Sequence, residues 1–228
     1  MNERSPRIVE LVGLAGAGKT TLANALCQIS NRIYICEHPN FHKIEHNPFF
    51  AWNSLLMLPT FTRLYFTNLN EKWLTPVELA RMVIMNGWWR LLQRKKSNTN
   101  NINIIDNGPL MILAGLRIFG PDYIKNQSMK KWWGFIIMQL ANVLDLIIWL
   151  DATDAILLDR VHQRDKWHPI QEQTKREAID FYARYRSEYG ELISIITASA
   201  EPPRVIALDT GELSVPDLIK TALAALNI

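Results

Sequence analysis

The chain has 228 residues, 48% of them hydrophobic, and a formal net charge of +3 at pH 7. This length and apolar content predict one well-filled domain over residues 1–228 rather than two. The basic residues are spread out apart from a short run at 94–96, so a nucleic-acid partner is not expected. With only Cys27 and Cys36, a disulfide framework and a cysteine-bound metal are excluded, as is typical of a reducing cytosol.

The N-terminal residues 1–7 lack the apolar core of a signal peptide, so the sequence predicts a cytoplasmic protein. The most apolar segment, residues 132–150, is interrupted by Gln139, Asn142 and Asp145. A buried helix followed by a buried strand explains this segment better than a transmembrane helix. Contact with a membrane surface is left open.

Five short apolar runs rich in β-branched residues alternate with helical stretches along the chain. The predicted strands cover residues 8–12, 33–36, 102–105, 146–150 and 205–208. This alternation is typical of a parallel sheet covered by helices on both faces, that is, a three-layer α/β sandwich.

The first predicted strand leads directly into a match to the phosphate-loop pattern G-x-x-x-x-G-K-[ST]. The match comprises Gly13, Leu14, Ala15, Gly16, Ala17, Gly18, Lys19 and Thr20. Backbone N–H groups of such a loop, together with the N-terminus of a helix predicted over 19–30, bind phosphates. We expect Lys19 to reach the β and γ phosphates and the Thr20 hydroxyl to face Mg²⁺, with Thr21 as a second candidate. The sequence therefore predicts a site for ATP and Mg²⁺.

The long segment between the second and third strands exceeds a simple crossover. We expect about residues 38–100 to form a helical insertion over the carboxyl edge of the sheet, where ligands bind in open α/β sheets. Pro39, Pro48 and Pro59 predict an irregular stretch at its start, and a long helix is expected over residues 76–93. An acceptor molecule would bind here.

Two carboxylates follow predicted strands and would lie at the same sheet edge. Asp106 ends the third strand, where a phosphate-loop protein holds a Mg²⁺-directed carboxylate, and a turn or helix cap is the alternative. The next residue is Asn107 rather than a glutamate that could activate water, which favours transfer to a bound acceptor. Glu37 ends the second strand and is a candidate base for an acceptor hydroxyl; a loop carboxylate or an orienting contact is left open.

Two arginines follow the fourth predicted strand. Arg160 and Arg164 are four residues apart and share one face of a helix. Arginine binds phosphate through two N–H groups and stacks on bases, although solvated surface arginines are common. The charged stretch 166–177 belongs to a predicted lid over about residues 160–180, whose closure would exclude water.

Taken together, these positions resemble the thymidylate kinase-like branch of phosphate-loop kinases, which includes the deoxynucleoside kinases. Beyond the phosphate loop, the similarity lies in Leu150-Asp151, in residues 158–164 and in the segment 181–192. The last segment looks very like the helix that follows the lid in thymidylate kinases. The resemblance implies a P-loop kinase fold that uses ATP and Mg²⁺.

The resemblance also implies roles for individual residues. Arg160 would lie against the ATP base and Arg164 would touch phosphates. Thr210 and Gly211, after the fifth strand, would border the adenine, and residues 215–226 would form the C-terminal helix.

One motif departs from the family. Thymidylate kinases follow the third-strand aspartate with an arginine, and deoxynucleoside kinases carry an acidic residue, Arg and Ser there, whereas this chain has Asp106-Asn107-Gly108. A nucleoside or nucleoside monophosphate is the expected acceptor, and a sugar or glycolipid precursor is the alternative. A nucleotide-dependent regulatory or assembly protein is a second alternative. Whether tryptophans of the middle region meet another subunit, in a homodimer, is left open.

Overall fold

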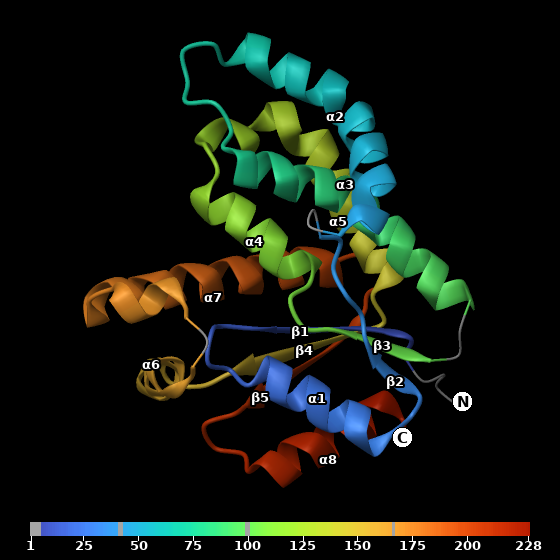
Figure 1. The fold of residues 1–228 in the computed structure, drawn as a ribbon, viewed down its shortest axis with the longest axis vertical. Coiled ribbons are helices and arrows are strands. Elements are labelled where there is room, and N and C mark those ends of the chain that lie inside the picture. Colours follow the sequence, from blue (N-terminus) through green and yellow to red (C-terminus); the bar gives the residue numbers. More distant parts are fainter. Residues whose placement is uncertain (1–5, 41–42, 99–100, 166) are drawn as a thin grey trace.

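The computed structural model describes residues 6–40, 43–98, 101–165 and 167–228. Five parallel strands form one sheet in the order β2-β3-β1-β4-β5 (Figure 1). The strands are β1 (Ile8–Gly13), β2 (Ile33–Ile35), β3 (Ile102–Ile105), β4 (Leu146–Asp151) and β5 (Arg204–Asp209). Their bounds differ from the predicted ones by at most one residue at each end.

Helices cover both faces of the sheet. The α-helices of the described residues are α1 (Lys19–Ile29), α2 (Asn47–Thr67), α3 (Pro76–Asn98), α4 (Pro109–Phe119), α5 (Lys130–Val143), α6 (Asp154–Gln163), α7 (Lys175–Thr197) and α8 (Val215–Leu226). In Figure 1, α1 and α8 lie on one face, α4, α5 and α7 on the other, and α2 and α3 form an outer layer beyond α4 and α5. The predicted α/β three-layer sandwich is confirmed.

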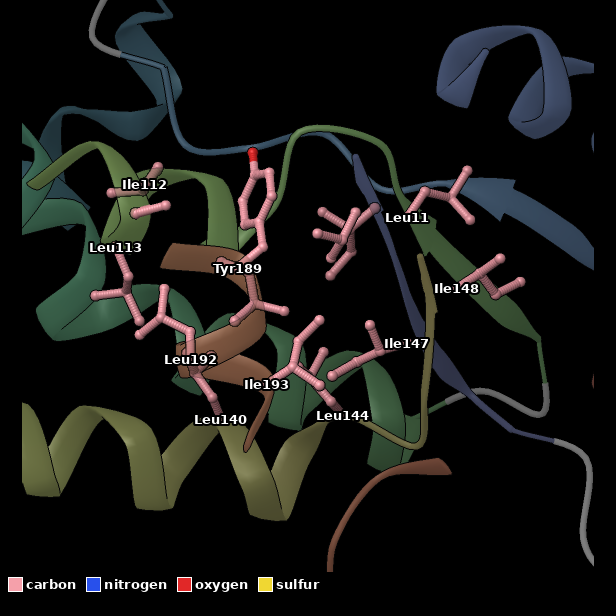
Figure 2. Close-up of a cluster of buried hydrophobic side chains, with 14 of the residues drawn as sticks. Leu11, Ile112, Leu113, Leu140, Leu144, Ile147, Ile148, Tyr189, Leu192 and Ile193 are labelled. Carbon is pink, nitrogen blue, oxygen red and sulfur yellow. The ribbon is translucent and has the colours of Figure 1, made fainter. Parts of the chain in front are cut away.

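The main core lies between the sheet and the helices α4, α5 and α7. Ile147 from the central strand β4 packs towards Leu140, Leu192 and Ile193 from the helices, whereas Leu11 of β1 points to the opposite face of the sheet (Figure 2). All five side chains are buried. Strands β1 and β3 are buried along their whole length, as expected for strands covered on both faces. This core fixes the carboxyl ends of β1, β3 and β4 relative to one another.

The segment 132–150 divides into a helix and a strand, as predicted. Helix α5 ends at Val143, and β4 begins at Leu146 in the middle of the sheet. Across the described ranges, no helix is both long and apolar enough to pass through a membrane.

The predicted irregular stretch around Pro59 is wrong, because α2 continues through this residue. Pro48 lies in the first turn of α2, where a missing N–H breaks no helical hydrogen bond. Tertiary packing outweighs the interior proline: the side chains that α2 buries are Phe50, Asn53, Met57 and Leu64.

Helix α3 also extends beyond its predicted end at Gln93 and stops at Asn98. Lys95 and Lys96 lie in the last turn, where positive charge complements the helix dipole. Lys96 Nζ further donates to the carbonyl oxygens of Asn142 and Val143 at 3.2 and 3.1 Å.

Candidate active site

The loop between β1 and α1 has the backbone shape of a phosphate cradle. Gly16 and Gly18 adopt left-handed conformations, with φ of +87° and +84°. A Cβ atom on Gly16 would lie 2.5 Å from the carbonyl oxygen of Leu157, and one on Gly13 would lie 2.2 Å from that of Leu150. Larger residues would therefore push the loop away from α6 and β4, so glycine is required at both contacts.

The Lys19 ammonium lies inside this loop. Its Nζ donates to the carbonyl oxygens of Gly13 and Leu14 at 2.9 and 3.0 Å. Burial lowers the pKa of Lys19 to about 8; the nearby Arg164 guanidinium adds to this effect and Asp106 opposes it. An amine held among carbonyls and exposed to the cleft can exchange these partners for phosphate oxygens.

Thr20 and Asp106, the two residues predicted to hold Mg²⁺, lie in contact. The Thr20 hydroxyl donates to Asp106 Oδ2 at 2.5 Å. Asp106 Oδ1 is buried and has no hydrogen-bond partner among the described residues. A hydroxyl and a carboxylate with a spare oxygen are the hard ligands that Mg²⁺ prefers, so this pair fits the expected ion.

Arg160 connects the phosphate loop to the turn after β5. Its Nη1 donates to Thr210 Oγ1 at 2.9 Å and to the Gly16 carbonyl at 3.4 Å, and Nη2 donates to the Thr210 carbonyl at 2.7 Å. Gly211, which the resemblance also places beside the adenine, lies in the same turn, where its N–H donates to Asp209 Oδ1 at 2.7 Å. Arg160 and Thr210 line the cleft described below, whereas Gly211 is not among its described lining residues.

Arg164 follows the last turn of α6 and faces the phosphate loop. Its charge lies close enough to Lys19 to lower the pKa of that residue. Its Nε is buried and has no hydrogen-bond partner within the described part of the chain. A guanidinium with a spare buried donor beside the lysine is suited to a phosphate oxygen.

A cleft of about 730 Å³ brings together Lys19, Thr20, Arg160, Arg164 and Thr210. Asp106 is not among its described lining residues but is bound to Thr20, which is. It lies at the carboxyl ends of β1 and β4, beside the point where the strand order changes direction. The phosphate loop forms one side, together with Arg160, Arg164 and Thr210. The volume falls within the range of roughly 300–1,000 Å³ that small-molecule sites occupy.

Helix α7 supplies an aromatic wall that the sequence reasoning did not assign to the site. Phe181, Tyr185 and Tyr189 follow one another at four-residue intervals and line the cleft. The rings of Phe181 and Tyr185 lie 4.8 Å apart, and those of Tyr185 and Tyr189 lie 5.7 Å apart. The four-residue spacing in the sequence is the signal that could have identified this wall.

Three ionic groups fix α6 and α7 to the end of β4. Arg186 Nε contacts Asp151 Oδ2 at 2.6 Å, and its Nη2 contacts Asp154 Oδ1 at 2.8 Å. Tyr182 on the same helix donates from its hydroxyl to the Ala15 carbonyl at 3.1 Å. These contacts join residues far apart in the chain, so no local pattern reveals them.

Glu37 lies beyond the end of β2 and does not reach this cleft. Its exposed carboxylate forms an ion pair with Lys43, whose hydrogen bond and charge lower the pKa of Glu37. It is not among the described residues that line the cleft, so its role as a base stays a prediction. In the predicted lid, Trp167 and His168 line the cleft, and Lys166 lies outside the described residues.

The fold resembles solved structures of nucleoside and nucleotide kinases. A deoxyadenosine kinase from M. mycoides with bound dCTP is 16% identical, with a TM-score of 0.53 and 96% of this chain and 98% of that chain covered. Thymidylate kinase from Candida albicans is 14% identical, with a TM-score of 0.59 over 98% and 92% of the two chains. The YorR protein from Bacillus subtilis, solved with phosphorylated GDP, is 13% identical, with a TM-score of 0.51 over 96% and 95%.

Comparison of the sequence with family models and with curated proteins gives no match. At such low identities the structural comparison concerns the fold. Over nearly its whole length, this chain has the P-loop kinase fold of thymidylate and deoxynucleoside kinases, as the resemblance implied.

Proposed function

We propose that this protein is a magnesium-dependent kinase that transfers the γ-phosphoryl group of ATP to a hydroxyl group of a nucleoside or to the phosphate of a nucleoside monophosphate. The observation that carries the proposal is the convergence of Lys19, Thr20 and Arg164 on one cleft with an aromatic wall, with Asp106 bound to Thr20. Phosphoryl transfer needs positioning and charge stabilisation more than covalent chemistry, and these groups supply both.

Each group has a separate task in this reaction. The loop amides hold the phosphates, and Lys19 exchanges its carbonyl partners for β- and γ-phosphate oxygens. Arg164 stabilises the charge that develops on the transferred group, and Arg160 closes the nucleotide end of the cleft. Thr20 and Asp106 would hold Mg²⁺, which offsets phosphate charge when bound.

Water must be kept away from the phosphoryl group if an acceptor is to receive it. The residue after Asp106 that reaches the cleft is Asn107, which is not a general base. The aromatic side chains of α7 face the same space and offer flat, apolar surface to a ring-shaped acceptor. This arrangement favours transfer over hydrolysis.

The charges in the cleft favour an acceptor without a phosphate of its own. Among the described lining residues, the lysines and arginines are Lys19, Arg160 and Arg164. Arg160 is bound to Thr210 and Gly16, and the other two lie beside each other at the phosphate loop. A nucleoside is thus a better candidate than a monophosphate, whose phosphate calls for a further cation.

The primary test is ADP release from Mg·ATP by the purified protein, alone and with pools of nucleosides, nucleoside monophosphates or sugars. We expect the nucleoside pool to stimulate release, and Lys19→Met to abolish the stimulation. Stimulation by sugars alone would replace the nucleoside with a sugar acceptor. A regulatory role would be favoured if the protein binds ATP, no small molecule stimulates ADP release, and a protein partner does.

Glu37 is the predicted base, and Glu37→Gln tests it at constant size. If Glu37 accepts the proton of the acceptor hydroxyl once the acceptor is bound, kcat falls about 100-fold or more and ATP affinity is unchanged. An unchanged kcat would mean that Glu37 is not the base and that its role is limited to the ion pair with Lys43.

A further inference from the structure

A carboxyl group is buried in the centre of the sheet, three residues before the phosphate loop. Glu10 is 0% exposed and lies in the middle strand β1, paired in register with Ile105 of β3 and Ile147 of β4. Burial raises the pKa of Glu10 to about 8, although a hydrogen bond from the Leu110 N–H acts in the opposite direction. Burial of an acidic group among apolar side chains costs free energy unless hydrogen bonds compensate for the lost contact with water.

The Glu10 carboxyl group contacts the turn between β3 and α4 and the first turn of α4. Glu10 Oε1 accepts the Leu110 N–H at 2.8 Å, in the first turn of α4. A Cβ atom on Gly108 would lie 2.3 Å from Oε1, so the carboxyl group occupies the space of a side chain at that position. Glu10 Oε2 is buried without a partner among the described residues.

The turn that Glu10 contacts begins with the carboxylate directed at Mg²⁺. Asp106 directly follows Ile105, which pairs with Glu10 in the sheet. Asp106 Oδ2 accepts a hydrogen bond from the Thr20 hydroxyl. Asn107 reaches the cleft, and Leu110 is anchored on Glu10. The turn is therefore held at one end by β3 and at the other by Glu10, and a shift at Leu110 displaces Asp106.

We propose that Glu10 is a positioning residue that fixes the turn from Asp106 to Leu110 and so holds the Asp106 carboxylate in place for the Mg²⁺ of a bound nucleotide. The inference rests on the proposed function for the identity of this ion. The contact of Glu10 with this turn can be tested whether or not the protein has kinase activity.

Two substitutions at Glu10 separate positioning from mere core filling. Glu10→Gln keeps the shape and the oxygen that accepts the Leu110 N–H, whereas Glu10→Met fills the space and removes the acceptor. The matched control is Glu78→Met. Glu78 is also buried and accepts a backbone N–H, that of Thr75 at 2.6 Å, but it does so at the start of α3.

The measurements are calorimetric binding of ATP with Mg²⁺ and with EDTA, and hydrogen exchange of the amides of residues 106–108 and Leu110. Mg²⁺ should increase the affinity for ATP. We expect Glu10→Met to raise the Mg²⁺ concentration at which half of this increase is reached about tenfold or more, the usual effect of losing a residue that orients a metal ligand. ATP affinity in EDTA should change less than about twofold, and exchange of the turn should accelerate. Glu10→Gln and Glu78→Met should retain the wild-type Mg²⁺ requirement.

Three outcomes would overturn the inference: an unchanged Mg²⁺ requirement in Glu10→Met, equal losses with Mg²⁺ and with EDTA, or a Gln variant as impaired as the Met variant. If Glu10→Met fails to fold, Gly108→Ala replaces it, because the added Cβ pushes the turn off the Glu10 carboxyl. If the wild type binds no Mg·ATP, the proposed function fails, and unchanged exchange at residues 106–108 and Leu110 then overturns the inference separately.

Discussion

The Thr20 hydroxyl donates to Asp106 at 2.5 Å and so joins the first turn of α1 to the end of β3. The second oxygen of this carboxylate is buried and free of protein partners within the described residues. Asp106→Asn keeps the shape but removes the negative charge. We expect the Mg²⁺ concentration required for half-maximal ATP binding to rise about 10–100-fold, measured by calorimetric titration. Asp122→Asn, on the surface, is the control, and equal behaviour of the two variants would refute the metal assignment.

Nucleotide affinity should depend on pH through Lys19. Because its pKa in the free protein is lowered to about 8, the amine loses its proton as the pH rises above 8. Phosphate favours the ammonium, so the dissociation constant for ATP should rise by up to about tenfold per pH unit above this value. Calorimetry between pH 7 and 9.5 measures this slope. Lys19→Met should bind weakly at every pH, and a slope unchanged in that variant would assign the titration to another group.

Arg160 should contribute to nucleotide affinity without affecting the metal. Removal of its guanidinium leaves the Thr210 hydroxyl and carbonyl without their donor and separates the turn after β5 from Gly16. Arg160→Met should weaken ATP binding by about 1.5–3 kcal/mol, the value of hydrogen bonds to a charged group, with an unchanged Mg²⁺ requirement. Arg160→Lys should not restore affinity, since an ammonium lacks the planar fork. Full affinity in both variants would leave Arg160 with a structural role.

The stability of the protein should fall as the pH rises, through Glu10. Its pKa is raised from 4.5 to about 8 in the folded state, so the folded protein retains a proton that the unfolded chain has lost between these values. The free energy of unfolding therefore decreases from pH 5 to pH 8 by roughly 2–4 kcal/mol through this group. Tyr189 faces Glu10, but its pKa is raised as well, so it stays neutral in this range.

Urea unfolding of the wild type and of Glu10→Gln at several pH values tests this expectation. Since Gln does not titrate, the stability difference between the two proteins isolates the Glu10 contribution from the other carboxyl groups. It should grow in favour of the Gln variant towards pH 8. A constant difference would mean that Glu10 ionises at an ordinary pKa.

The sequence predicted the sheet and the phosphate loop because both depend on local patterns. Strand β3 begins and ends at the predicted residues. In the segment from Gly13 to Thr20, the left-handed backbone conformations occur at glycines of the sequence pattern itself. Thr20 and Asp106 were each predicted to face Mg²⁺, and they lie in contact because the carboxyl ends of neighbouring parallel strands meet at one edge.

Long-range packing decided what the sequence could not show. The α2 helix passes through Pro59 because its neighbours stabilise it, against the local preference. The contact of Arg186 with Asp151 spans 35 positions, and Glu10 lies 100 positions from Leu110. Glu37 followed the strand-end rule and still points to Lys43, because the chain beyond a short edge strand is free to turn away from the cleft.

The outer helices α2 and α3 enter the fold from β2 and leave it into β3, two strands that are neighbours in the sheet. The phosphate loop, Arg160 and Thr210 come from other connections of the same sheet. The segment that the sequence predicts to bind the acceptor is thus one continuous insertion between two adjacent strands, and the described lining residues of the cleft come from outside it. Such an insertion can be lengthened, shortened or exchanged without disturbing the strand register that positions the phosphate loop.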